Sequence, residues 1–138
     1  MARILVIDDD ADILRLLASV LGNQGYDVET AADGRQGIEL LEKASFDLVL
    51  TDLTMPEVDG MAVLEYLSSH FPETLCIVLT GYGTIESSVE AMKNGAFDYI
   101  TKPVKSSELL LLVEKSLQFK NLEVENTRLK KELKKTYQ

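Results

Sequence analysis

Five polar residues stand at the ends of short apolar runs, where the chain could do chemistry: Asp8, Asp9, Asp52, Thr80 and Lys102. Three carboxylates that meet would repel one another and raise one another's pKa unless a cation joins them. Oxygen ligands at a partly open site suit Mg²⁺, which binds a few carboxylates and keeps several waters. A lysine and a threonine hydroxyl would then bind the oxygens of a phosphoryl group, and one carboxylate could accept it.

Each acid also has an ordinary structural interpretation. Asp10 and Asp12 suit the cap or first turn of a helix, and this is the role that we expect for both. The same capping role is open to Asp8 and Asp9, and Asp52 taken alone would be an ordinary loop acid. The convergence of all the polar residues at one place is what favours a functional site.

Strands and helices alternate along the chain and would position these residues. Apolar runs predict strands over Ile4–Asp8, Tyr26–Ala31, Leu48–Asp52, Leu75–Thr80 and Asp98–Thr101. The third and fourth runs are apolar almost throughout, which is typical of parallel strands covered on both faces, whereas the second alternates and suits an edge. Helical spacing predicts helices over residues 13–21, from Asp33, over 59–69 and 84–94, and from an N-cap at Ser106 or Ser107.

Five such βα units predict an α/β fold with a parallel sheet and helices on both faces. Right-handed crossovers favour the flavodoxin-like doubly wound (βα)5 sheet of strand order 2-1-3-4-5, here with an extended C-terminal helix. In such a sheet the site forms at the carboxyl ends of the strands beside the switch point. These are the first and third strands, which end at Asp8 and Asp52.

The composition indicates a soluble globular protein. The chain has 138 residues, of which 46% are hydrophobic and 27% charged, both ordinary values. Its net charge of −9 argues against direct contact with nucleic acid, and no apolar run approaches the length of a membrane span. The single cysteine, Cys76, allows no disulfide within the chain, and no cleavable signal pattern is present. We therefore expect a cytoplasmic protein.

With these motifs in this order, the sequence resembles a bacterial two-component response-regulator receiver domain. The resemblance covers residues 3 to 118 and rests on "VIDDD", "LVLTDLTMPEVDG", "VLTGYG" and "GAFDYITKPV". Each motif alone is weak, whereas the ordered set is specific. The resemblance implies that Asp52 accepts a phosphoryl group from the phosphohistidine of a sensor histidine kinase. It also implies that Mg²⁺ is bound by Asp8, Asp9, Asp52 and the backbone carbonyl of Thr54.

Further roles follow from the same resemblance. Lys102 and Thr80 are expected to bind the phosphoryl group, Gly81 leaves access beside Thr80, and the peptide bond from Lys102 to Pro103 is expected to be cis. Thr80 and Tyr99 match the switch pair of the family, in which the hydroxyl moves to the phosphoryl oxygens and the aromatic ring turns inward. Phosphorylation would thus bias two packings of the face near Tyr99.

Thr54 and Tyr82 occupy the two positions that in this family tune loss of the phosphoryl group. Neither side chain offers an amide or a carboxylate to orient an attacking water. We therefore expect a long-lived phosphoprotein with slow autodephosphorylation, a regulatory domain rather than an enzyme.

The pattern of the last helix continues past residue 118, where a receiver should end. Residues 1–118 hold 20 acids and 8 bases (−12), whereas 119–138 hold 3 acids and 6 bases (+3). A heptad frame fills its two seam positions, a and d, with Phe119, Leu122, Asn126, Leu129 and Leu133. An asparagine at position a favours a parallel two-stranded coiled coil. We expect a receiver domain over 1–118 and, over 119–138, a dimer-forming linker; the alternative is a solvated, partly disordered linker.

The segments "GYGTIESSVEAMKNGAFDYITKPV" and "LEVENTRLKKEL" are most similar to receivers of enhancer-binding AAA+ transcription activators. This likeness implies a missing C-terminal output domain, an AAA+ ATPase with a DNA-binding part, and a dimer that phosphorylation rearranges. The alternative output is a cyclic-nucleotide or kinase module. Two other classes are a haloacid-dehalogenase-like phosphatase, whose Asp-x-Asp pattern Asp8 and Asp10 formally satisfy, and a flavodoxin, whose flavin phosphate the acids would repel.

Overall fold

The computed structural model of the chain describes residues 2–55, 57–81 and 85–137, and for Ile85 and residues 123–137 we describe the backbone alone. The elements within these ranges are β1 (Arg3–Ile7), α1 (Ala11–Gly22), β2 (Asp27–Ala31), α2 (Gly34–Lys43), β3 (Leu48–Asp52), α3 (Gly60–His70), β4 (Leu75–Thr80), α4 (Ile85–Lys93), β5 (Asp98–Thr101) and α5 (Ser106–Tyr137). The strands pair in parallel in the order β2-β1-β3-β4-β5. This is the predicted flavodoxin-like fold.

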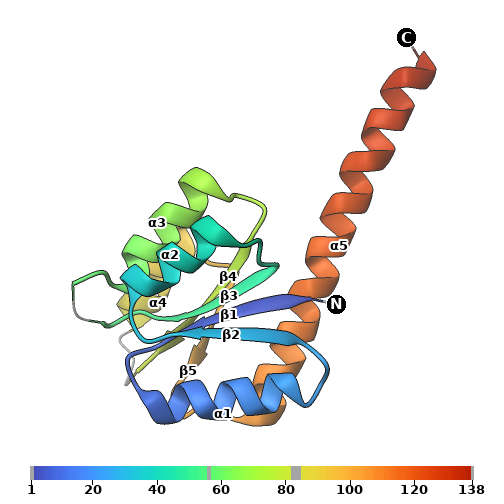
Figure 1. Cartoon of the computed structure of the whole chain (residues 1–138). Helices are drawn as coiled ribbons and strands as arrows, with labels where there is room; N and C mark the ends of the chain where they lie inside the picture. Colours follow the sequence, from blue (N-terminus) through green and yellow to red (C-terminus); the bar gives the residue numbers. More distant parts are fainter. Residues whose placement is uncertain (1, 56, 82–84, 138) are drawn as a thin grey trace.

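Alternate strand residues supply two apolar layers, one on each face of the sheet. The layer that contains Leu5 and Ile7 packs against α2, α3 and α4. The layer that contains Ile4 and Val6 packs against α1 and α5. Figure 1 shows the corresponding separation of the helices on the two sides of the sheet. Residues 4–7 are fully buried, which is why the sequence of β1 is apolar without alternation.

The bounds of β3, β4 and β5 agree with the sequence prediction, and those of the first two strands shift by one residue. β1 ends at Ile7, so that Asp8 lies just beyond the strand. β2 begins at Asp27, which is opposite Arg3 in the ladder. The preceding Tyr26 belongs to the turn, where its N–H donates to the Leu21 carbonyl.

Aspartates cap the helices that begin near the site. Asp10, Asp33 and Asp59 are the N-caps of α1, α2 and α3, and Asp12 lies in the first turn of α1, as predicted for Asp10 and Asp12. The predicted N-cap of the last helix, Ser106 or Ser107, was wrong by one or two residues. Ser106 already lies inside α5, and the Leu109 N–H donates to the Lys105 carbonyl, so the cap position is Lys105.

α5 is one continuous helix of 32 residues, whose second half projects beyond the sheet (Figure 1). Leu109, Val113 and Ser116 on its first half are fully buried. Among the residues that the structure describes, no helix combines the length and apolar character that a membrane span needs.

Candidate functional site

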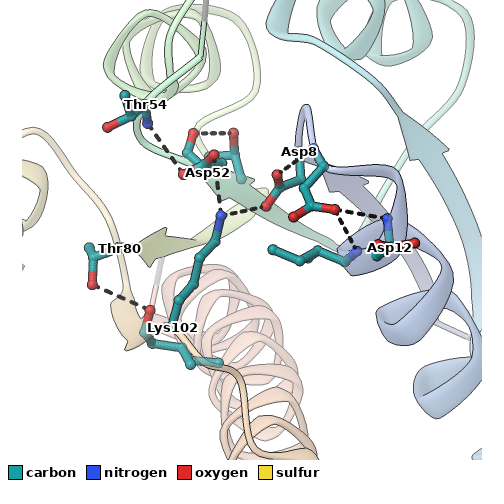
Figure 2. Close-up of polar contacts among 10 residues, drawn as sticks. Asp8, Asp12, Asp52, Thr54, Thr80 and Lys102 are labelled. Carbon is teal, nitrogen blue, oxygen red and sulfur yellow. Dashed lines mark hydrogen bonds and ion pairs between the residues drawn. The ribbon is translucent and has the colours of Figure 1, made fainter. Parts of the chain in front are cut away.

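The five predicted polar residues meet at the carboxyl edge of the sheet. Asp8 and Asp9 follow β1, Asp52 ends β3, Thr80 ends β4 and Lys102 follows β5. Figure 2 shows Asp8, Asp52, Thr80 and Lys102 gathered from these separate strands. Asp8, Asp52 and Thr80 are buried, whereas Asp9 is exposed, so the site is open on one side.

Asp8, Asp9 and Asp52 each offer an oxygen atom, and these three atoms lie within 4.8 Å of one another. Burial raises the pKa of Asp52, and the charge of Asp8 raises it further. Lys102 and the Thr54 N–H, which donates to Asp52 Oδ1 over 3.3 Å, lower that pKa by less. The folded chain therefore concentrates negative charge that a cation would stabilise.

Lys102 is the counter-ion that this structure provides. Its Nζ lies 2.9 Å from Asp8 Oδ2 and 3.3 Å from Asp52 Oδ2 (Figure 2). Burial lowers the pKa of Lys102, but the contacts with both carboxylates raise it by more, so that the lysine stays charged. The predicted role of Lys102 was to bind a phosphoryl group. Its pairing with Asp8 and Asp52 was not predicted, and the only signal for it was the common sheet edge of the three residues.

Asp8 retains an unused binding capacity. Its Oδ1 accepts a hydrogen bond from the Asp10 N–H over 2.9 Å. Its buried Oδ2 pairs with the Lys102 ammonium over 2.9 Å and accepts no hydrogen bond from any other residue in the described part of the chain. A buried carboxylate oxygen with this single cationic neighbour among the described residues can also bind a hard divalent cation. The oxygen-only donor set of the three aspartates thus fits Mg²⁺.

Asp10 caps α1 and does not belong to the acidic cluster of Asp8, Asp9 and Asp52. It is exposed, and its Oδ1 accepts hydrogen bonds from the N–H groups of Asp12 and Ile13 at the start of α1. An Asp-x-Asp pair with Asp8, as in a haloacid-dehalogenase-like phosphatase, would need this carboxylate at the reacting centre. The capping geometry therefore favours the receiver interpretation.

Thr80 and Tyr99 lie on neighbouring strands. The buried Thr80 hydroxyl donates a hydrogen bond to the Ile100 carbonyl on β5 over 3.4 Å. Tyr99 directly precedes Ile100 on β5, and 43% of Tyr99 is exposed. A movement of the Thr80 hydroxyl would therefore release a bond to the strand that carries Tyr99.

The remaining predicted residues surround this edge. Gly81 is exposed, and a Cβ atom there would meet no atom of the described residues within 4 Å. The Lys102–Pro103 peptide bond is cis, as expected. Tyr82 lies outside the described residues. On the C-terminal helix Phe119 and Leu122 are exposed, whereas the side chains of the other three seam residues lie outside the described part: Asn126, Leu129 and Leu133.

Gly60, the last residue of the motif "LVLTDLTMPEVDG", has a structural role that was not predicted from the sequence. A Cβ atom at Gly60 would lie 2.4 Å from the Asp52 carbonyl oxygen and 2.7 Å from Leu53 Cα. Its N–H donates to the Leu53 carbonyl over 3.1 Å. The absence of a side chain therefore lets the start of α3 pack directly on the backbone that carries Asp52. The Asp-Gly pair ahead of a helical pattern was the available signal.

The parallel sheet of this order, with an acidic cluster and a lysine at its carboxyl edge, defines the class to which the protein belongs. Residues 4–114 match the response regulator receiver domain family, and the chain is a member of that family. The Clostridium thermocellum response regulator receiver domain protein has a similar structure, with a TM-score of 0.84 and 35% identity over 88% of this chain and 98% of that one.

Longer regulators contain similar domains. Regulatory protein AtoC of Escherichia coli (strain K12) is 37% identical over 99% of this chain and 30% of its own length. Transcriptional regulatory protein ZraR of the same strain is 40% identical over 83% of this chain and 26% of its own. NtrX from Brucella abortus, in complex with ATP, gives a TM-score of 0.89 and 34% identity over 93% of this chain and 29% of that one. The chain thus spans less than a third of the length of these relatives. The identity to AtoC and ZraR confirms the predicted likeness to receivers of transcription regulators.

Proposed function

We propose that this chain is a phosphorylation-dependent switch of a two-component system and that Asp52 accepts the phosphoryl group from a sensor histidine kinase. The observation that carries the proposal is the position of Asp52 at the end of the central strand β3. On one side lies Asp8 after β1, and on the other lies Thr80 at the end of β4. Lys102 contacts Asp52 directly. Asp52 is thus the carboxylate that all the other groups surround.

The transfer exchanges one bond to phosphorus for another. An oxygen of the Asp52 carboxylate attacks phosphorus, the P–N bond of the phosphohistidine breaks, and the leaving imidazole takes up a proton. The Lys102 ammonium neutralises charge on the phosphoryl oxygens, and the Thr80 hydroxyl donates a hydrogen bond to one of them. Gly81 carries no side chain, which leaves room for the incoming group.

Mg²⁺ fits this proposal as the cofactor. Asp8, Asp9, Asp52 and the backbone carbonyl of Thr54 would hold the ion. Its positive charge would stabilise the transferring phosphoryl group. The cluster of three carboxylate oxygens supports this assignment.

Phosphorylation would act on the rest of the domain through Thr80. A phosphoryl oxygen offers a charged acceptor, which is stronger than the Ile100 carbonyl that Thr80 uses in this structure. When the Thr80 hydroxyl gives up its hydrogen bond to β5, the half-exposed ring of Tyr99 turns inward. This movement changes the face formed by α4 and β5. Thr54 and Tyr82 supply no group that orients water, so the phosphorylated state decays slowly.

The partners follow from the longer relatives. The chain acts in the cytoplasm and forms a homodimer through its C-terminal helix. It controls an output domain with an AAA+ ATPase and a DNA-binding part. The similarity to ZraR, a transcriptional regulatory protein, and to NtrX, whose structure contains ATP, supports this output over a cyclic-nucleotide or kinase module.

Incubation with Mg²⁺ and phosphoramidate, followed by intact-mass measurement, tests the proposal. The wild-type chain gains the mass of one phosphoryl group, whereas Asp52→Asn gains none because the nucleophilic oxygen is lost. Asp10→Asn is the matched control, since its amide oxygen still caps α1 and it should be modified like the wild type. Modification of Asp52→Asn at the wild-type rate would refute the assignment.

A further inference from the structure

The buried stripe of α5 continues past the predicted domain border at residue 118. Leu109, Val113 and Ser116 are fully buried and follow one another at helical spacings. The next residue of this stripe is Lys120, whose side chain is only 19% exposed. The receiver body therefore packs against the helix for a further turn, and that turn ends with a charged residue in place of an apolar one.

Asp47, which lies directly before β3, receives the Lys120 side chain. Lys120 Nζ lies 3.1 Å from Asp47 Oδ1. The other oxygen, Oδ2, accepts from the Arg3 N–H over 2.8 Å, and the Asp47 N–H donates to the Arg3 carbonyl over 2.9 Å. Burial raises the pKa of Asp47, but the Arg3 N–H and Lys120 together lower it by more. Asp47 is thus a fixed, ionised anchor when Lys120 reaches it.

Phe97, which lies directly before β5, provides a second anchor. The rings of Phe97 and Phe119 have their centroids 5.0 Å apart with an interplanar angle of 48°, a favourable tilted arrangement. Phe97 is held in turn by its N–H, which donates to the Cys76 carbonyl on β4 over 2.7 Å. Phe119 remains 42% exposed, so one face of its ring packs on Phe97 while another stays open.

We propose that Phe119 and Lys120, held by Phe97 and Asp47, form a clamp that fixes the direction in which α5 leaves the receiver body. The two anchors belong to different loops, so together they resist rotation of the helix as well as bending. The border between receiver and linker then lies after residue 120, and the helix that follows turns with the receiver as one body. The anchors precede β3 and β5, the strands whose far ends carry Asp52 and Lys102.

Hydrogen exchange of the backbone amides of residues 117–125 tests the clamp. We expect Lys120→Ala and Phe119→Ala to speed this exchange by about fivefold or more, because the local opening of the helix becomes easier. Asn121→Ala is the control, since Asn121 is exposed on the same turn and outside the a and d positions. Lys120 also lies outside these positions, so its effect cannot come from a coiled-coil seam. Equal exchange in Lys120→Ala and Asn121→Ala would overturn the proposal.

Asp47→Asn provides a second, independent test, because its amide oxygen can still accept from the Arg3 N–H. If the ion pair acts as proposed, Asp47→Asn loosens the same amides, and the double variant with Lys120→Ala is no looser than either single one. Additive effects would contradict a direct coupling. Phosphoryl uptake from phosphoramidate should stay at the wild-type level in all these variants, so failure of the clamp and failure of the proposed function are distinguishable.

Discussion

The pKa of Asp52 is raised because its carboxylate is buried and lies beside the carboxylate of Asp8. The folded chain therefore binds a proton at Asp52 more tightly than the unfolded chain, and this group makes the fold less stable as the pH rises above 3.8. We predict that Asp52→Asn raises the free energy of unfolding at neutral pH by roughly 1 kcal/mol, or a few degrees in Tm. Thermal denaturation in a chelator measures this, and a lowered Tm would contradict it.

Glu57 has a positive φ of 62°, in the left-handed region that favours glycine. We predict that Glu57→Gly raises the free energy of unfolding by about 0.5–1 kcal/mol. Glycine removes the steric cost of the left-handed conformation, and its greater freedom in the unfolded chain offsets part of this gain. Glu57→Ala keeps the steric cost and is the control, without a comparable gain. Urea denaturation of both variants separates the backbone effect from the loss of the carboxylate.

At the scale of elements, the contact between α3 and β3 decides the position of Asp52. Gly60→Ala would place a methyl group within 2.4 Å of the Asp52 carbonyl oxygen, so the helix or the strand must move. We predict a loss of about 2 kcal/mol in stability and, in addition, slower phosphoryl uptake from phosphoramidate. Gly22→Ala is the matched control, because a Cβ atom there meets no atom of the described part of the chain within 4 Å. Wild-type uptake in folded Gly60→Ala would show that Gly60 does not position Asp52.

Asp47 joins the start of β1, the loop before β3 and α5, and its pKa is lowered. A carboxylate of lowered pKa stabilises the fold above its ordinary pKa of 3.8, and this contribution disappears as the pH falls through the folded value. Because the side chain is 40% exposed, solvent screening keeps the effect small. We predict that Asp47→Asn loses roughly 0.5 kcal/mol at pH 7. Denaturation curves of variant and wild type should converge in acid.

For the whole molecule, the distribution of charge and exposed apolar residues bears on assembly. Leu122 is 63% exposed on a helix that projects beyond the sheet (Figure 1). Residues 1–118 carry a net charge of −12, whereas residues 119–138 carry +3. We predict that the 138-residue chain is a dimer in light scattering and that a chain ending after residue 121 is a monomer. The shorter chain keeps Phe119 and Lys120, so it should still fold and take up a phosphoryl group. A monomeric 138-residue chain would refute the coiled-coil prediction.

The sequence alone determined the strand order, the bounds of β3 to β5, the capping role of Asp10, the helix starts near Asp33 and Asp59, and the convergence of the polar residues. These features depend on apolar periodicity, local capping chemistry and the handedness of crossovers, all of which short stretches of sequence carry. The family motifs added the expected roles of Asp52 and Lys102.

Only the tertiary structure decided which partners these residues choose. It paired Lys102 with Asp8 and Asp52, placed the Thr80 hydroxyl on the Ile100 carbonyl, and joined Lys120 to Asp47. Asp47 and Lys120 are 73 residues apart, and no local pattern links them. Such contacts form because separate elements pack on one sheet, and their geometry depends on all of those elements together.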